Sequence, residues 1–223
     1  MLRVKICGIM TPAQGKEIAR LGANAIGFIC VEKSPRYVTP EQIREIAMAL
    51  PKETHRIGVF MNHKLETIVS TVETSGLTSV QLHGSESVEF CKQVRSALPA
   101  TELIKAFRVE SAETLKSTQD YTSVVDWLLL DAYHPTLGGG TGLVLDWETL
   151  SAFKSDRPWF LAGGLTPENL AAALDSLSPQ GIDLSSGVEI SPGDKDLAKV
   201  AALFEAIAPV SATHTYRQRC REN

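Results

Sequence analysis

Eight short apolar runs alternate with amphipathic stretches along the 223 residues of the chain, and this alternation limits the folds open to it. Each run has the length of a strand, and several are apolar at successive positions, as in strands buried on both faces. Helix start signals stand between the runs: Thr11, Thr39 and Thr166 each precede a proline, and Ser85 and Ser111 precede helical patterns. The runs are residues 2–7, 25–29, 56–60, 79–82, 103–107, 127–131, 159–162 and 181–184. The sequence therefore predicts eight strand–helix units.

Such units pair their strands in parallel, because each crossover helix returns the chain to the same end of the sheet. Gly22 and Gly76 stand where two of the helices would stop. Two architectures fit this pattern, a closed (β/α)8 barrel and an open doubly wound sheet. The units are even, at about 28 residues each, and no break divides them, which favours a single (β/α)8 TIM barrel of the phosphate-binding type.

The predicted barrel occupies residues 1–208 as one domain. The strand–helix pattern dissolves after Pro209, and we expect residues 209–223 to form a partly disordered tail whose three arginines are solvated.

Composition argues against several classes of protein. The net charge is −4, whereas a nucleic-acid binder would show a basic domain or stripe. The four cysteines match neither a disulfide framework nor a metal knuckle, and the five histidines form no metal-binding pair, so no metal is predicted. The chain begins with a strand pattern rather than a secretory signal, and no apolar run approaches the roughly 18 residues of a membrane span. We therefore expect a cytoplasmic protein with neither membrane nor nucleic acid as a partner.

In a barrel of this type, the active site lies at the carboxyl ends of the strands and in the loops that follow them. The residues at these positions include a thiol, a guanidinium, an imidazole and a carboxylate. They are Cys7, Arg36, His83 and Asp131. The sequence predicts that all four face one mouth of the barrel.

Two Gly/Ser loops follow the seventh and eighth strands, where barrels often bind a phosphate. Their central residues are Gly163, Gly164, Ser186 and Gly187. Glycines let backbone N–H groups approach an anion closely, and a following helix adds a positive dipole end. The alternative is that these glycines only permit tight turns, but two such loops in the right places favour a phosphate site.

Asp131 follows four apolar residues, so partial desolvation would suit it as a general acid. The alternatives are a helix cap or a salt bridge in a loop. A glycine-rich segment follows it, and it is either a floppy connector or a lid that excludes water from a bound ligand. The candidate lid residues are Gly139, Gly140, Thr141 and Gly142.

The other candidates each have a structural alternative. A lone cysteine such as Cys7 is usually a small buried hydrophobe, and acting as a base would require a thiolate that nothing in the sequence explains. Arg36 suits bidentate contact with a carboxylate, or else a surface salt bridge. His83 either contacts a ligand or packs at the barrel rim. Cys30, Cys91 and Cys220 are interpreted as inert.

Motifs at these strand ends give the chain a resemblance to the phosphoribosylanthranilate isomerase family, which acts in tryptophan biosynthesis. They follow the family order from residue 3 to about residue 207, although Cys30 stands where an aromatic residue is common and residues 132–137 have no assigned role. The motifs are residues 5–8, 27–28, 34–38, 58–60, 81–84, 131 with 139–142, 161–165, 183–189 and 192–196.

The resemblance implies an Amadori rearrangement of N-(5-phosphoribosyl)anthranilate to 1-(2-carboxyphenylamino)-1-deoxyribulose 5-phosphate. It implies Asp131 as general acid and Cys7 as general base. Arg36, His83 and Asp183 would then bind the substrate. No redox change or group transfer occurs, so no cofactor is implied. The protein would act on a small sugar phosphate, as a monomer or a homodimer.

Two alternatives stay open. The histidine-pathway ribonucleotide isomerase family resembles this one, but an aspartate is expected there at the position of Cys7. A barrel that senses phosphorylated ligands without catalysis would require neither Cys7 nor Asp131.

Overall fold

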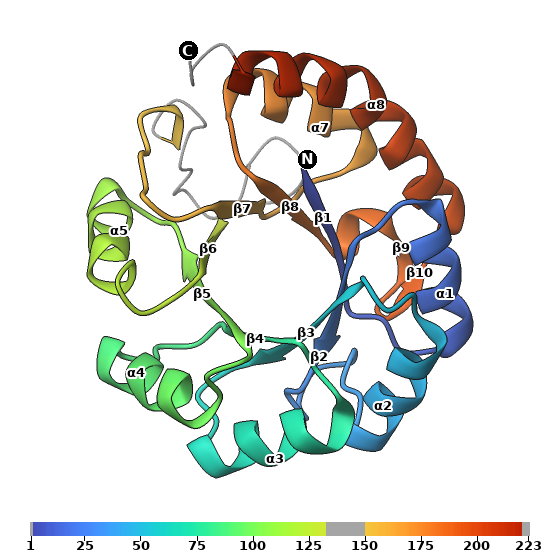
Figure 1. Cartoon of the computed structure of the whole chain (residues 1–223). Helices are drawn as coiled ribbons and strands as arrows, with labels where there is room; N and C mark the ends of the chain where they lie inside the picture. Colours follow the sequence, from blue (N-terminus) through green and yellow to red (C-terminus); the bar gives the residue numbers. More distant parts are fainter. Residues whose placement is uncertain (1, 133–149, 220–223) are drawn as a thin grey trace.

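The computed structural model describes residues 2–132 and 150–219, and the side chains among them up to residue 208. Eight parallel strands close into a barrel in the order β1 to β8, with β8 paired to β1, and helices surround this ring (Figure 1). The strands are β1 Arg3–Cys7, β2 Ala25–Ile29, β3 His55–Phe60, β4 Ser79–Leu82, β5 Glu102–Arg108, β6 Trp127–Asp131, β7 Trp159–Ala162 and β8 Gly181–Leu184. The predicted closed barrel is confirmed, and the open sheet is not the fold.

The outer helices begin and end largely where the sequence signals predict. Thr39 closes a capping box with Gln42 at the start of α2, and Gly22 and Gly76 cap the ends of α1 and α3. The helices are α1 Pro12–Leu21, α2 Pro40–Ala49, α3 Leu65–Ser75, α4 Val88–Ala97, α5 Ala112–Ser117, α7 Pro167–Ser176 and α8 Leu197–Arg219, with 3-10 turns η1 Thr118–Tyr121 and η3 Ser186–Val188. A short hairpin, β9 Glu189–Ser191 with β10 Asp194–Lys195, precedes α8.

One helix start differs from the prediction. The cap of α4 is Ser87 rather than Ser85, and its hydroxyl accepts the N–H of Phe90 at 3.2 Å. Ser85 instead donates its N–H to Asn62 Oδ1 at 2.8 Å, which ties the loop after β4 to the loop after β3. A contact between two loops determines the helix start here, and such a contact leaves no local signal in the sequence.

Two apolar cores hold the barrel together. The larger lies between the strands and the helices, while a smaller cluster fills the barrel interior and includes Ile57, Ile104, Leu129 and Phe160. Alternation along each strand sends successive side chains to these two sides. Residues two apart, such as Leu129 and Asp131, therefore share the interior, with the apolar member deeper and the polar member at the mouth.

The chain end continues as helix beyond the predicted domain boundary at residue 208, because α8 runs to Arg219. Residues 220–223, including Cys220, lie outside the described residues, and the division into a barrel at 1–208 and a tail at 209–223 stays a prediction. Across the described ranges, no helix is both long and apolar enough to cross a membrane.

Candidate active site

A cavity of about 270 Å³ opens at the carboxyl ends of the strands. The structure brings nine of the sequence-predicted site residues to its wall: Cys7, Arg36, His83, Asp131, Gly163, Gly164, Asp183, Ser186 and Gly187. The proposed lid residues, Gly139, Gly140, Thr141 and Gly142, lie outside the described residues.

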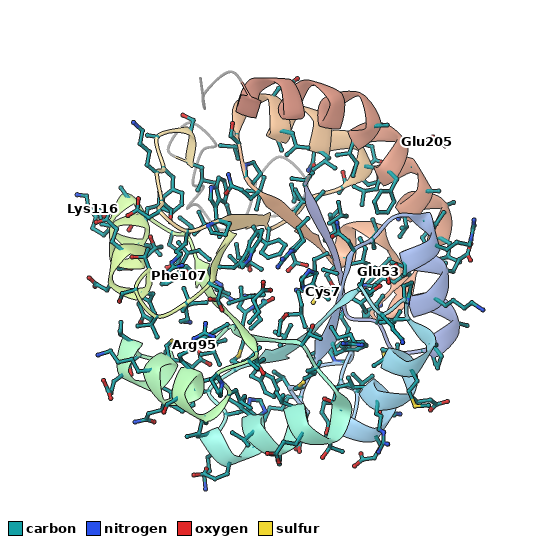
Figure 2. All side chains as sticks on the ribbon, viewed as in Figure 1. Cys7, Glu53, Arg95, Phe107, Lys116 and Glu205 are labelled. Carbon is teal, nitrogen blue, oxygen red and sulfur yellow. The ribbon has the colours of Figure 1, made fainter. Side chains whose placement is uncertain are left out.

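Cys7 ends β1 and points into the barrel on the inner side of that strand (Figure 2). Its neighbour across the sheet is Gly27, where an added Cβ would lie 2.7 Å from Cys7 Sγ, so only glycine leaves room for the thiol. Burial raises the pKa of the Cys7 thiol, although the ammonium groups of Lys5 and Lys195 act in the opposite direction. The structure thus supplies two cations near the thiol, but burial outweighs them.

Lys5 lies beneath Cys7 and is fully buried. Its Nζ donates to Asp183 Oδ2 at 2.8 Å and to Gln81 Oε1 at 2.9 Å, so it joins β1 to β8 and β4. The second Asp183 oxygen, Oδ1, is buried and has no partner among the described residues. Because an unsatisfied buried carboxylate oxygen is costly, Asp183 is prepared to accept a hydrogen bond from a ligand.

His83 and Asp131 face each other across the mouth, with 3.6 Å between His83 Nε2 and Asp131 Oδ2. This separation exceeds a hydrogen bond, but catalytic contacts often tighten only when a ligand binds. On its other side, His83 Nδ1 lies 2.9 Å from Gln81 Nε2. His83 therefore contacts a polar side chain of the interior, Gln81, and faces Asp131 at the rim. The side chains of His83 and Asp131 are both part-exposed.

Arg36 makes an ion pair with Glu189. The sequence allowed a surface salt bridge for Arg36, but this partner is buried. Its Nε and Nη2 donate to the two oxygens of Glu189 at 2.8 Å and 2.6 Å, and Lys195 Nζ donates to Glu189 Oε1 at 2.6 Å. Although burial opposes ionisation, these donors and the Gly193 N–H lower the pKa of Glu189 to about 2. Arg36 Nη1 has no partner among the described residues, which leaves one edge of the guanidinium for a ligand.

The two Gly/Ser loops pack tightly against their neighbours. An added Cβ on Gly187 would lie 1.9 Å from the carbonyl oxygen of Leu165, and one on Gly163 would lie 2.5 Å from that of Ala132. Asn169 of α7 donates to the carbonyl of Gly164 at 2.9 Å and so anchors the loop after β7. The glycines at positions 163 and 187 permit close packing of backbones, and this packing brings both loops to the cavity wall.

The other two described cysteines are away from this chemistry. Cys30 and Cys91 are buried, and burial raises the pKa to about 12 for Cys30 and to about 11 for Cys91. Their interpretation as inert, packed thiols agrees with this environment. Among the residues that the structure describes, no cluster of three metal-ligating side chains occurs.

Four polar residues of the site had no assigned role in the sequence analysis: Lys5, Gln81, Glu189 and Lys195. Lys5 and Gln81 do carry a signal, because each interrupts an apolar strand at a position that faces the interior. Glu189 and Lys195 carry none, since they belong to a hairpin that only the fold brings under Arg36.

Comparison with known proteins assigns the family. The family model described as "N-(5'phosphoribosyl)anthranilate (PRA) isomerase" matches residues 4–206. The chain belongs to the phosphoribosylanthranilate isomerase family. Among curated relatives named N-(5'-phosphoribosyl)anthranilate isomerase, that of Gloeothece citriformis is 58% identical over 206 residues, which covers 92% of this chain and 94% of the relative. That of Acaryochloris marina is 58% identical over 212 residues, with 92% and 98% covered.

Solved structures of phosphoribosylanthranilate isomerases share the fold. The enzyme from Thermotoga maritima superimposes with a TM-score of 0.83 at 36% identity, covering 92% of this chain and 98% of that one. A further isomerase structure, in complex with reduced 1-(o-carboxyphenylamino)-1-deoxyribulose 5-phosphate, gives a TM-score of 0.79 at 33% identity, with the same coverage. The second structure shows that a barrel of this family holds a carboxyphenylamino sugar phosphate.

Proposed function

We propose that the cavity carries out the isomerisation for which the family is named, the Amadori rearrangement of N-(5'-phosphoribosyl)anthranilate, by general acid–base catalysis. The observation that supports this most directly is that Cys7 and Asp131 line one cavity together with Arg36 and the two Gly/Ser loops. An acid and a base for the sugar, a guanidinium for the anthranilate carboxylate and a cradle for the phosphate match the three parts of this substrate.

The topology suggests how the substrate lies. The loops after β7 and β8 would hold the phosphate through backbone N–H groups. Because β6 pairs with β7 and β1 pairs with β8, a phosphate held there places the sugar between Asp131 and Cys7. The free edge of Arg36 would hold the anthranilate carboxylate, and Asp183 Oδ1 would accept a ribose hydroxyl.

Asp131 would act first, as a general acid. Its protonated form gives a proton to the ring oxygen of the furanose, the C1′–O bond breaks, and the electron pair of the anthranilate nitrogen forms an iminium.

Cys7 would act second, as the base that removes the proton from C2′. The bonding electrons move to neutralise the iminium, and the enolamine then tautomerises to the ketone. Burial raises the thiol pKa, but the iminium brings a positive charge beside it. That charge, added to those of Lys5 and Lys195, favours the thiolate at the moment when the base is needed.

The chemistry conserves oxidation state overall and transfers no group, so the reaction needs no cofactor. We also propose a cytoplasmic location and a monomeric or homodimeric state. The free thiols of Cys7, Cys30 and Cys91 support a reducing compartment.

The test is a direct assay with purified full-length protein and phosphoribosylanthranilate, following the loss of anthranilate-type fluorescence. Turnover that disappears in both Cys7→Ser and Asp131→Asn supports the assignment. Binding without turnover would instead identify a sensor of phosphorylated ligands. Complementation of a tryptophan auxotroph that lacks this isomerase, with the same two variants, checks the activity in the cell.

A further inference from the structure

A chain of polar side chains crosses the barrel beneath the cavity and links the two sides of the site. It runs from Asp183 through Lys5 and Gln81 to His83 and Asp131. The successive distances are 2.8 Å (Asp183 Oδ2 to Lys5 Nζ), 2.9 Å (Lys5 Nζ to Gln81 Oε1), 2.9 Å (Gln81 Nε2 to His83 Nδ1) and 3.6 Å (His83 Nε2 to Asp131 Oδ2). Gln81 at its centre is buried and lies at the cavity wall.

The buried ammonium of Lys5 determines which way the Gln81 amide points. Burial alone would lower the pKa of Lys5, but Asp183 holds it above its ordinary value, so the group stays charged. An ammonium offers only donors, and the atom of Gln81 that faces it must therefore be the carbonyl oxygen. The amide nitrogen is then turned towards His83.

The Gln81 amide in turn determines which nitrogen of the His83 ring carries the proton. An amide NH₂ also offers only donors, so His83 Nδ1 must accept and carries no proton. A second ring proton on Nδ1 would oppose the Gln81 N–H groups. The ring proton of His83 is thereby placed on Nε2, and this N–H faces Asp131 Oδ2.

Among residues 2–132 and 150–208, the other charged groups near this ring do not offer Nδ1 an alternative acceptor. Lys105 of β5 donates to the carbonyl of Gly84 at 2.8 Å and pairs with Glu86 at 3.1 Å. Arg108 of β5 is the register partner of Asp131. The remaining titratable or charged groups of the cavity wall are Cys7, Arg36 and Asp183.

We propose that Gln81 is a positioning residue, which fixes the Nε2–H tautomer of His83 and through it the oxygen from which Asp131 delivers its proton. This inference rests on the proposed role of Asp131 as the acid. A donor on Nε2 faces Asp131 Oδ2 and occupies this oxygen when the contact tightens around the substrate, so the acidic proton sits on Oδ1 and is directed to the substrate. In the other tautomer, Nε2 would present a lone pair and draw that proton towards the imidazole.

The test combines the ring tautomer with kinetics on the full chain. Protein labelled with ¹⁵N-histidine has five imidazoles, and the His83→Gln spectrum assigns the signals of His83 by difference. We expect the wild-type His83 ring to carry a proton on Nε2 and none on Nδ1. Gln81→Glu offers Nδ1 an acceptor and should move a proton onto it. Gln81→Met keeps the length of the side chain but removes both polar atoms, and should give a mixture of tautomers.

We expect kcat of Gln81→Glu to fall about tenfold or more, short of the roughly 10²–10⁴ contributed by a general acid itself. KM should change about twofold or less, because the contacts to phosphate and carboxylate are intact. Gln180→Met is the matched control, since it removes an amide that bonds to Ser178 and Trp159 at the opposite end of the strands. It should keep wild-type kcat.

A wild-type ring protonated on Nδ1 would overturn the inference. So would a Gln81→Glu variant whose ring spectrum is unchanged, or whose kcat equals that of the control. Normal turnover in Asp131→Asn would instead overturn the proposed function, because the tautomer of His83 is measured without reference to activity.

Discussion

At the residue scale, the two candidate catalytic groups are placed by strand alternation and adjusted by buried neighbours. Cys7 and Asp131 are the last residues of β1 and β6, on the interior side of each strand. Lys5, two residues before Cys7, puts a cation beneath the thiol. The chemistry at the mouth thus depends on the polar side chains just below it, Lys5, Gln81 and Asp183. Contacts among these residues of different strands determine the charge near the thiol and the orientation of the Gln81 amide.

Replacing Asp131 with Asn should leave the fold intact and reduce kcat/KM by roughly 10²–10⁴, because the amide is nearly isosteric but cannot act as an acid. Circular dichroism and steady-state kinetics on the purified variant measure the two effects. Retention of more than about a tenth of wild-type activity would contradict the general-acid role.

Cys7 should be the cysteine whose alkylation stops catalysis. Because burial raises its pKa, reaction with iodoacetamide should be slow at pH 7 and should accelerate as the pH rises and more of the thiol is ionised. A product analogue should slow the reaction by covering the thiol. Mass-spectrometric mapping identifies the labelled residue.

The control is a variant in which Cys7 is the only cysteine left, and it should be inactivated at the wild-type rate. Inactivation that follows labelling of Cys30, Cys91 or Cys220 while Cys7 stays unmodified would remove Cys7 as the base. Normal turnover by Cys7→Ser would have the same consequence.

Glu189 should contribute to stability in a pH-dependent way. Its folded-state pKa of about 2 lies below the ordinary value of 4.5, so the contribution is full above pH 4.5 and is lost as the pH falls towards 2. Urea unfolding of Glu189→Gln and wild type should differ most above pH 5 and converge in acid.

Glu17→Gln is the matched control, because Glu17 pairs with Arg20 on the exposed face of α1. Exposed pairs contribute little, so this variant should unfold like the wild type at every pH. A Glu189→Gln variant with the same pH dependence as wild type would show that the ion pair with Arg36 and Lys195 does not stabilise the fold.

At the element scale, the loops after β7 and β8 form the proposed phosphate site only because they can touch each other. Leu165 belongs to the loop after β7, and Gly187 belongs to the loop after β8. The carbonyl oxygen of Leu165 occupies the space that a Cβ atom at position 187 would need. Close packing of two backbones is thus the structural condition for a wall made of N–H groups.

Gly187→Ala should force these loops apart, raise KM for the sugar phosphate, and lower Tm. Gly76→Ala is the control: its φ of +71° disfavours a side chain, but nothing lies within 4 Å of the new Cβ. It should lower the free energy of unfolding by the cost of that backbone conformation, roughly 1 kcal/mol or slightly more, and lower Tm accordingly. KM should stay unchanged. Equal KM values for the two variants would mean that the loop contact does not shape the site.

At the scale of the whole molecule, the barrel separates stability from chemistry. Apolar clusters fill the interior up to the mouth and the space beneath the helices, while the cavity gathers residues from loops and strands around the ring. A ligand that contacts several of these loops should therefore stabilise the entire barrel.

Inorganic phosphate should raise Tm and compete with substrate. Binding to the folded state alone stabilises by about 2.7 kcal/mol at a concentration 100 times Kd. Asp131→Asn should show the same stabilisation, since Asp131 is not part of the proposed phosphate wall, whereas Gly187→Ala should show less. An anion that stabilises all three proteins equally would bind elsewhere.

The sequence by itself determined the barrel and the content of its mouth. The eight apolar runs match the eight strands to within a residue at each end, because buried parallel strands are apolar at nearly every position and helices between them have local caps. Strand alternation and order then bring Cys7, His83 and Asp131 to one end, since the carboxyl ends of all eight strands lie together. Local signals suffice for these properties.

Only the tertiary structure decided the electrostatics of the site and the exact loop contacts. Lys5 meets Gln81 and Asp183 across the closed ring, and Glu189 reaches Arg36 from a hairpin more than 150 residues away in sequence. The start of α4 at Ser87 likewise follows from a contact between two loops. Charge, tautomer and desolvation depend on distances between side chains that are remote in sequence, and closure of the barrel sets those distances.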